Sequence, residues 1–352
     1  MAVTISDVAK HAGVSKSTVS NFLNGKYEMM SKETREVLEK TVKELAYTPN
    51  LSARRLPNKD KSRTVCLIIP RNLTHIFDTM YYPTVFHSIE KMAEEMKFNV
   101  LIYSRNRTDS YNEMQYLKGL AGSIVDGFLI YDLPKDDEFF REFQNSGIPY
   151  VCVGKIDGVD DYNYVASDHY KAFIDTCEYL YQLGHRKIGW VRHDEGGVVD
   201  ITRHRAAQDF VQSKKDMVTV EEICIPVKAS ETDIYTLFKK QLSSEDRPTT
   251  FIISFGLKQS LTMAARELGL DIPRDLSYVD IEYYRRSSIS TETITRVDSK
   301  AGLVSELAFK KLLRIIYASD KAFESQIVPL ELTLGDTTSP CRRTEVSENR
   351  RD

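Results

Sequence analysis

Long hydrophobic segments are missing from this chain of 352 residues. No apolar run approaches the roughly 20 residues that span a bilayer, and the opening stretch MAVTISDVAK lacks the apolar core of a signal peptide. Cysteine is scarce as well, because only five residues are scattered along the chain and no CxxC pair occurs. Scattered thiols fit a reducing compartment better than a disulfide framework. The sequence therefore predicts a cytoplasmic protein with no membrane segment.

Signatures of catalysis are also missing. The sequence contains no GxxxxGK[S/T], GxSxG or HExxH motif. The seven histidines are dispersed, and the densest groups, RHD at 192–194 and RHR at 203–205, resemble surface or cleft-rim positions more than metal ligands. We therefore expect no enzymatic activity, no cofactor and no metal site.

The net charge of −3 conceals an uneven distribution. Residues 1–63 carry 12 Lys and Arg against 7 Asp and Glu, a net charge of +5. The remaining residues carry 36 against 44, a net charge of −8. A basic N-terminal part suggests that this part meets a polyanion, although ordinary charge fluctuation explains the charges alone equally well.

The first 48 residues contain the signals of three short helices. Thr4 caps the first helix and Gly13 ends it. Ser15 caps the second helix, and Ser31 caps a third whose pattern stops at Pro49. Two helices joined by a short turn that contains glycine have the spacing of a helix-turn-helix, in which the second helix enters the major groove of DNA.

The second helix, KSTVSNFL, has two different faces. Its apolar residues fall at i, i+3 and i+4 and are Val19, Phe22 and Leu23. The opposite face carries four polar residues, Lys16, Ser17, Ser20 and Asn21. A recognition helix needs a slim polar face whose donors and acceptors reach base edges. We therefore predict that these four residues contact DNA, and the alternative is a solvated face on a small bundle.

Residues 4–56 resemble the DNA-binding head of the LacI/GalR family of bacterial transcription regulators. The resemblance lies in TISDVAKHAGVSKSTVSNFLNG and SKETREVLEKTVKELAYTPNLSARRL. It implies a homodimer, or a tetramer, that binds a pseudo-palindromic operator in double-stranded DNA with one recognition helix per half-site. Asn21 stands where the family usually has arginine, and asparagine favours adenine where arginine reads guanine.

Residues 49–63 are expected to form a hinge helix and linker. The stretch from Leu51 to Leu56 lies between two prolines and is too short to be a stable helix alone. The family resemblance implies that it becomes ordered over the minor groove of the operator, with contacts from Ala53, Arg54 and Leu56. Leu56 would act there as a wedge that bends the DNA.

From Thr64 onward, short apolar runs alternate with amphipathic stretches, which predicts βα units and parallel sheets. The runs YLYQLGHRKIGWV and AARELGLDIPRDLSYV resemble the two-lobed, periplasmic-binding-protein-like body of the same family. We therefore predict an α/β fold, with an N-terminal helix-turn-helix domain and doubly wound parallel sheets in two lobes.

The expected boundaries are 1–48 for the helix-turn-helix domain, 49–63 for the hinge, 64–340 for the effector-binding and dimerisation domain and 341–352 for a disordered tail. Lobe 1 should cover about 64–165 and 293–322, and lobe 2 about 166–290 and 325–340. The crossovers between the lobes are expected near 164–167, 288–294 and 321–326.

An effector site is expected where the strands of the two lobes end. Family members usually bind a sugar or a nucleobase there, and binding changes the affinity for DNA. Arg203 stands at the position of the family's effector-binding arginine, Tyr82 and Phe255 offer aromatic platforms, and Glu282 offers a carboxylate. Gly256 replaces a usual carboxylate near several cations, which favours an anionic sugar derivative.

These observations favour a repressor of carbohydrate-related genes. In one alternative, the body senses a partner such as a phosphorylated carrier protein, or has no effector at all. A sugar-binding protein for transport would explain the body, but it would not explain the head.

Overall fold

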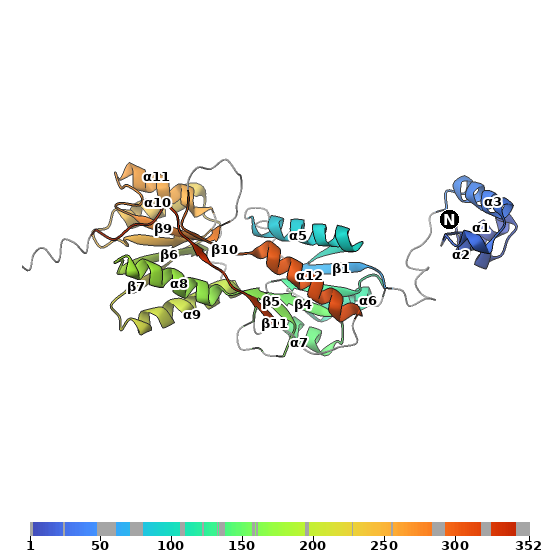
Figure 1. Cartoon of the computed structure of the whole chain (residues 1–352), viewed down its shortest axis with the longest axis horizontal. Helices are drawn as coiled ribbons and strands as arrows, with labels where there is room; N and C mark the ends of the chain where they lie inside the picture. The colour runs from blue at the N-terminus through green and yellow to red at the C-terminus, as the bar shows by residue number, and fades with distance from the viewer. Residues whose placement is uncertain are drawn as a thin grey trace, which may run out of the picture. The chain divides into compact units, whose positions relative to one another are not determined.

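The computed structural model describes residues 3–23, 25–47, 61–70, 80–105, 110–121, 123–131, 133, 138–156, 159, 161–193, 197–226, 228–254, 256–283, 293–317 and 325–342. The chain divides into two compact units, Met1–Ser62 and Arg63–Asp352, which we call the head and the body (Figure 1).

The head contains three helices that begin and end where the sequence signals lie. They are α1 (Ile5–Ala12), α2 (Lys16–Leu23) and α3 (Lys32–Glu44), with the 3-10 turn η1 (Tyr27–Met29) before α3. Thr4, Ser15 and Ser31 each accept a backbone N–H at the start of a helix. Gly13 ends α1 with φ of 67°, a conformation that glycine adopts without steric cost. The three predicted caps are therefore confirmed.

A small hydrophobic cluster holds the head together. Its buried members come from all three helices and are Val8, Ala9, Val19, Phe22 and Leu38. The two residues from α2 belong to the apolar face that the sequence predicts. With these buried, the opposite side of α2 remains available for polar contacts.

The body contains two six-stranded sheets, in the orders β11-β5-β4-β3-β1-β2 and β12-β10-β9-β8-β6-β7. The strand pairs are parallel apart from β10 with β12. The first sheet contains β1 (Thr64–Ile69), β2 (Asn99–Ser104), β3 (Gly127–Tyr131), β4 (Tyr150–Val153), β5 (Tyr164–Ser167) and β11 (Ser325–Val328). The second contains β6 (Lys187–His193), β7 (Thr219–Ile225), β8 (Thr250–Ile253), β9 (Ser277–Tyr283), β10 (Arg296–Asp298) and β12 (Leu332–Thr333). The predicted fold class is confirmed, and we call the parts built on these sheets lobe 1 and lobe 2.

Helices cover both faces of each sheet. In lobe 1 they are α5 (Tyr81–Met96), α6 (Ser110–Ala121), α7 (Glu138–Asn145) and α12 (Ala301–Tyr317). In lobe 2 they are α8 (His169–Gln182), α9 (Val198–Ser213), α10 (Glu231–Leu242) and α11 (Leu257–Glu267). Helices α5 and α12 pack on one face of the lobe 1 sheet and α6 and α7 on the other, while α8 and α9 lie opposite α10 and α11 in lobe 2.

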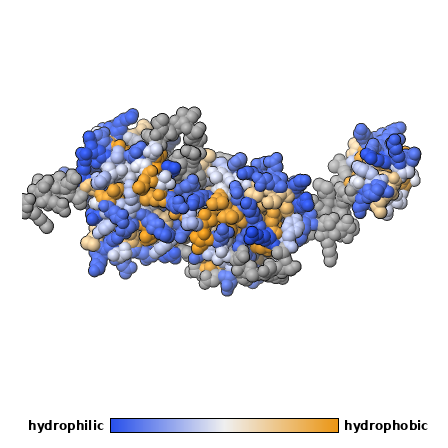
Figure 2. All heavy atoms as spheres, viewed as in Figure 1, coloured by the Kyte–Doolittle hydropathy of each residue, from blue (hydrophilic) through white to orange (hydrophobic). Residues whose placement is uncertain are grey.

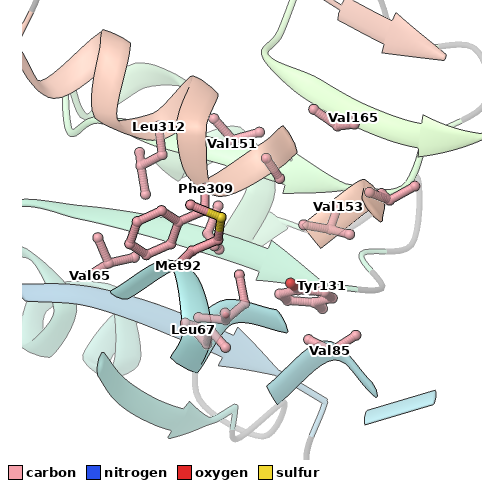
Figure 3. Packing of buried hydrophobic residues seen from close by; sticks show 14 of the residues in the cluster. Val65, Leu67, Val85, Met92, Tyr131, Val151, Val153, Val165, Phe309 and Leu312 are labelled. Carbon is pink, nitrogen blue, oxygen red and sulfur yellow. The ribbon is translucent and has the colours of Figure 1, made fainter. Parts of the chain in front are cut away.

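The strand β1 shows why continuous apolar runs become central strands. Val65 and Leu67 pack with α5 and α12, against residues such as Phe309 (Figure 3). Cys66 and Ile68 point to the other face and join the cluster of α6 and α7. Because successive side chains alternate between the faces, a strand covered on both sides needs an apolar residue at every position.

The strand pairing corrects the predicted boundaries of the lobes. β5 still pairs within lobe 1, so the first crossover follows Ser167. β10 pairs with β9, so residues 293–298 belong to lobe 2 and the second crossover lies at 299–300. β11 pairs with β5, and β12 with β10, so the third crossover lies at 329–331. The prediction was wrong here because these short strands are assigned by their hydrogen-bonding partners, which hydropathy does not reveal.

The start of the predicted tail is also corrected. Cys341 is 9% exposed, and its N–H donates to the carbonyl of Leu183 over 2.7 Å, so this residue is part of lobe 2. Residues 343–352 lie outside the described residues. The five cysteines are all free thiols. Within the described ranges, none of the helices is long and apolar enough to cross a membrane.

Hydrophilic residues cover much of the visible surface, and hydrophobic residues gather over lobe 1 around α12 (Figure 2). Two apolar side chains of that helix, Leu303 and Tyr317, are 46% and 56% exposed.

Candidate functional sites

The first candidate site is the polar face of α2. Lys16 and Ser17 are exposed, and Ser20 and Asn21 are half-buried beside the apolar cluster. The structure therefore places the four predicted residues on the side of α2 away from Val19 and Phe22. The exposed side chains supply one charged donor and one short hydroxyl, which suits contacts with phosphates and base edges.

The start of α2 is fixed by hydrogen bonds. The Thr18 N–H donates to the Ser15 hydroxyl over 3.1 Å, and the Val14 N–H donates to the Ala9 carbonyl over 3.0 Å across the turn from α1. Behind the end of α2, the rings of Phe22 and Tyr27 lie 5.9 Å apart. These contacts hold α2 from both ends, which limits the directions that its polar face can take.

Basic residues are concentrated after the three helices of the head. Residues 3–47 carry seven Lys and Arg against six Asp and Glu, a net charge of +1. Residues 48–63 carry five against one, a net charge of +4. The predicted contacts Ala53, Arg54 and Leu56 belong to this second stretch and lie outside the described residues.

The second candidate site surrounds Arg203 in lobe 2. Arg203 lies on α9 and is 2% exposed. Its Nη1 donates to Glu282 Oε1 over 2.7 Å and lies 3.6 Å from Asp200 Oδ1, while Nη2 donates to the Ile281 carbonyl over 3.5 Å. The structure thus joins two predicted effector residues, Arg203 and Glu282, in one ion pair between α9 and the end of β9.

Two further carboxylates lie beside this pair. Burial raises the pKa of Asp200 to about 6, against the opposing charge of Arg203. Burial also raises the pKa of Asp280 to about 7, although Asp280 accepts the Glu282 N–H over 3.0 Å. The nearby positive charge of Lys258 also opposes the shift at Asp280. Among the described residues, Arg203 therefore has three carboxylates close to it, and two of them, Asp200 and Asp280, retain protons more readily than usual.

The pKa of His169, the first residue of α8, is also shifted near Arg203. Burial and, to a smaller extent, the positive charge of Arg203 together lower the pKa of its imidazole to about 3. His169 is therefore neutral at physiological pH and adds hydrogen-bonding capacity to the site without adding charge.

The sequence analysis missed Asp200, Asp280 and His169. Asp200 stands three residues before Arg203 on one helix, and Asp280 stands two residues before Glu282 on one strand, so both spacings were visible. The sequence gives no comparable signal for His169, because α8 approaches Arg203 only in the folded lobe.

Of the two predicted aromatic platforms, the structure describes Tyr82 alone. Tyr82 lies on α5 in lobe 1, where its ring packs 5.0 Å from Tyr81 and 6.0 Å from Phe86. Phe255 lies outside the described residues. Within the described ranges, no group of three or more His, Cys, Asp and Glu is arranged to hold a metal ion.

Each of the two units contains a match to a known protein family. Residues 4–50 match the family described as bacterial regulatory proteins, lacI family. Residues 177–338 match the periplasmic binding protein-like domain.

Proteins with similar sequences align with this chain over most of their length. Catabolite control protein A of Priestia megaterium is 28% identical over 340 residues, which cover 94% of this chain and 97% of that protein. The HTH-type transcriptional repressor PurR of Serratia proteamaculans is 28% identical over 344 residues, which cover 92% and 93%.

Solved structures share the fold at lower identity. The lac repressor dimer bound to operator and the anti-inducer ONPF has a TM-score of 0.76 and 21% identity, covering 96% of this chain and 100% of that chain. The complex of the transcriptional regulator CelR with cellobiose has a TM-score of 0.65 and 21% identity, covering 95% and 99%.

Proposed function

Because the chain belongs to the LacI/GalR family of bacterial transcription regulators, we propose that it represses genes through a pseudo-palindromic operator. The observation that carries this proposal is the polar face of α2, which is held by caps and presents Lys16 and Ser17 to solvent. In a helix-turn-helix, a short polar face of this kind reads the major groove. Ser20 and Asn21 complete the proposed contacts, with Asn21 suited to adenine.

We propose that the operator-binding form is a homodimer. The strand β2 lies at the edge of its sheet, and its side chains Val100 and Ile102 are 36% and 51% exposed. Beside it lies a groove of about 500 Å³ between α5 and β2, and its lining includes Phe86 and Ile89 of α5 and Phe98, which connects α5 to β2. An exposed apolar edge beside an apolar groove favours burial against another chain. A second copy would supply the same surface with two-fold symmetry.

We further propose a neutral, hydroxyl-rich effector at Arg203. The guanidinium is already paired with Glu282, so an anion would have to compete with a carboxylate at 2.7 Å. Asp200 and Asp280 add acceptors for hydroxyl groups close by. This proposal replaces the anionic effector that the sequence favours. The complex of the similar regulator CelR with cellobiose supports the choice of a sugar.

Full-length variants test the DNA-binding proposal. An operator is first selected from random duplexes with the full-length chain, and affinity is then measured by fluorescence anisotropy. Lys16→Ala should weaken operator binding at least tenfold, about 1.4 kcal/mol. The control Lys40→Ala removes a lysine of α3 whose side chain is 77% exposed, and it should change affinity much less. Equal losses in both variants would refute base or phosphate contact by α2.

Calorimetric titration tests the effector proposal. Neutral sugars are compared with their phosphorylated forms on the same full-length protein. We expect the neutral member of each pair to bind more tightly and Arg203→Ala to abolish its binding. Tighter binding of the phosphorylated members would contradict the proposal.

A further inference from the structure

A cavity of about 170 Å³ lies in lobe 2, beside the N-terminal ends of β6, β8 and β9. Four segments of the chain line it, at His185, around Arg247, at 273–276 and at 340–342. The first three segments come just before β6, β8 and β9, which are parallel and therefore begin on the same side of the sheet. Leu276 lies at this end of β9 and Glu282 at the other, roughly 20 Å away along an extended strand. The cavity is therefore separate from the site around Arg203.

Hydrogen bonds hold the walls of this cavity. His185 is 2% exposed, and its Nε2 lies 3.1 Å from the Ser339 carbonyl, which can only accept. Nε2 therefore donates, and Nδ1 accepts the Thr249 hydroxyl over 2.8 Å. Burial lowers the pKa of His185 to about 4, so its ring is neutral at physiological pH. The Ser339 hydroxyl donates to the Pro273 carbonyl over 2.7 Å, which joins a further wall to the same network.

Positive charge predominates in the lining of the cavity. Among the described residues, the lining carries Arg247, Arg274 and Arg342 against the single carboxylate of Asp275, a net charge of +2. Arg274 pairs with Asp275 over 3.1 Å. The hydrogen bond from Arg274 and, to a smaller extent, the charge of Arg342 lower the pKa of Asp275, so this carboxylate stays ionised. Its single negative charge balances only part of the positive charge.

Two of these arginines have further contacts in the wall. Arg247 is 9% exposed, and its Nη1 and Nη2 donate to the carbonyls of Pro248 over 3.2 Å and Asp275 over 3.1 Å. These carbonyls fix the plane of the guanidinium without contributing a negative charge. Arg274 also pairs with Asp271, which lies outside the lining. Even with this second carboxylate, guanidinium groups remain in excess around the cavity.

A bound anion would balance this charge. The planar N–H groups of arginine match the oxygens of phosphate groups, and a phosphate near pH 7 carries up to two negative charges. A cavity of this size has roughly the volume of five or six waters, which accommodates a phosphate group and a few carbon atoms. Leu276, which is 1% exposed, and the lining residues Pro273 and Pro340 offer apolar contacts to such carbon atoms.

We propose that this cavity is a second ligand site, which binds a phosphate group. Arg274 and Arg342 donate to the phosphate oxygens from the exposed side, and Arg247 contributes its charge from the wall. The bound group joins the segment 273–276 to the segment 340–342 through their arginines. This site is independent of operator binding and of the effector proposed at Arg203.

Calorimetric titration of the full-length protein, at neutral pH and constant ionic strength, tests the site with inorganic phosphate, glycerol 2-phosphate and acetate. Both phosphates should bind, and acetate should bind at least tenfold more weakly because it carries one charge. Arg274→Ala and Arg342→Ala alter exposed residues, and each should weaken phosphate binding about tenfold or more, as expected for a hydrogen bond to a charged group. The matched control is Arg266→Ala, an exposed arginine of α11 outside the lining, which should change little.

Thiol labelling locates the bound phosphate. Cys341 is a free thiol that lines the cavity, whereas Cys224 is an exposed free thiol on β7 outside the lining. Labelling with a maleimide is followed at both cysteines by mass spectrometry of digested protein. Inorganic phosphate should slow the labelling of Cys341 and leave the rate at Cys224 unchanged.

The outcomes decide whether the site exists and which phosphate it takes. Binding that both arginine variants weaken, together with protection of Cys341, would support the site. Tighter binding of glycerol 2-phosphate would then indicate a phosphorylated molecule, and tighter binding of inorganic phosphate would indicate free phosphate. Absence of binding, or binding that neither variant changes, would overturn the proposal. Phosphate binding that is lost only in Arg203→Ala would assign the anion to the effector site instead.

Discussion

Replacing Asp280 by asparagine should stabilise the body in a pH-dependent way. Asp280 is 7% exposed, and burial raises the pKa of its carboxyl from 3.8 to about 7. The N–H of Glu282 opposes this shift, and the charge of Glu282 reinforces it. The folded protein therefore holds the proton more tightly than the unfolded chain. Between these two pKa values, the free energy of unfolding falls as the pH rises, because the Asp280 carboxyl ionises more readily in the unfolded chain than in the folded protein.

The magnitude follows from the size of the pKa shift. One pKa unit corresponds to about 1.4 kcal/mol. Between pH 5 and pH 7, Asp280 should thus lower the free energy of unfolding by about 2 kcal/mol. Asp280→Asn keeps the volume and an acceptor oxygen but removes the titration. The variant should be more stable than the parent at pH 7, with a gain about 2 kcal/mol larger than the gain at pH 5.

Urea unfolding at pH 5, 6, 7 and 8 measures this difference. The control Asp246→Asn alters a carboxylate whose side chain is 91% exposed, and its effect should be small at every pH. A gain in Asp280→Asn that is the same at pH 5 and pH 7 would refute the reasoning. A loss of stability at pH 7 would show that the charged carboxylate is favourable in the folded lobe.

Two further predictions concern DNA. Leu56→Ala should lower operator affinity at least tenfold, about 1.4 kcal/mol. The melting temperature of the free protein should not change, because the proposed wedge acts only on bound DNA. A large fall in melting temperature with intact DNA binding would instead place Leu56 in a hydrophobic core. Asn21→Arg should move the preference toward guanine at one half-site position in a selection from random operators, and an unchanged consensus would exclude base readout by Asn21.

The head was predictable because its signals are local. Thr4, Ser15 and Ser31 each act on a backbone group within a few residues, and Gly13 acts on its own backbone angle. The central strands of the body were predictable for a different reason, because burial on both faces leaves a continuous apolar run such as TVCLII. The short strands β5, β10 and β11 have no such continuous apolar run. The sequence analysis therefore placed the three crossovers too near the N-terminus.

Two residues of the candidate effector site, Arg203 and Glu282, were singled out from the sequence, but their contact with each other was not. Arg203 and Glu282 are 79 positions apart and were expected to bind a ligand separately. Only the packing of α9 against β9 shows that they bond to each other. The pKa values of Asp200 and Asp280 depend on burial, which the spacing of the carboxylates alone does not show. The ion pair between Arg203 and Glu282 is the reason why we propose a neutral polyol in place of the anionic ligand that the sequence favours.

The distribution of charge suggests how affinity and sequence recognition are divided. The three helices of the head carry a net charge of only +1, whereas residues 48–63 carry +4. Phosphate contacts dominate affinity and base contacts decide sequence. A movement of the body that repositions residues 48–63 would therefore change affinity while the face of α2 continues to read the same bases.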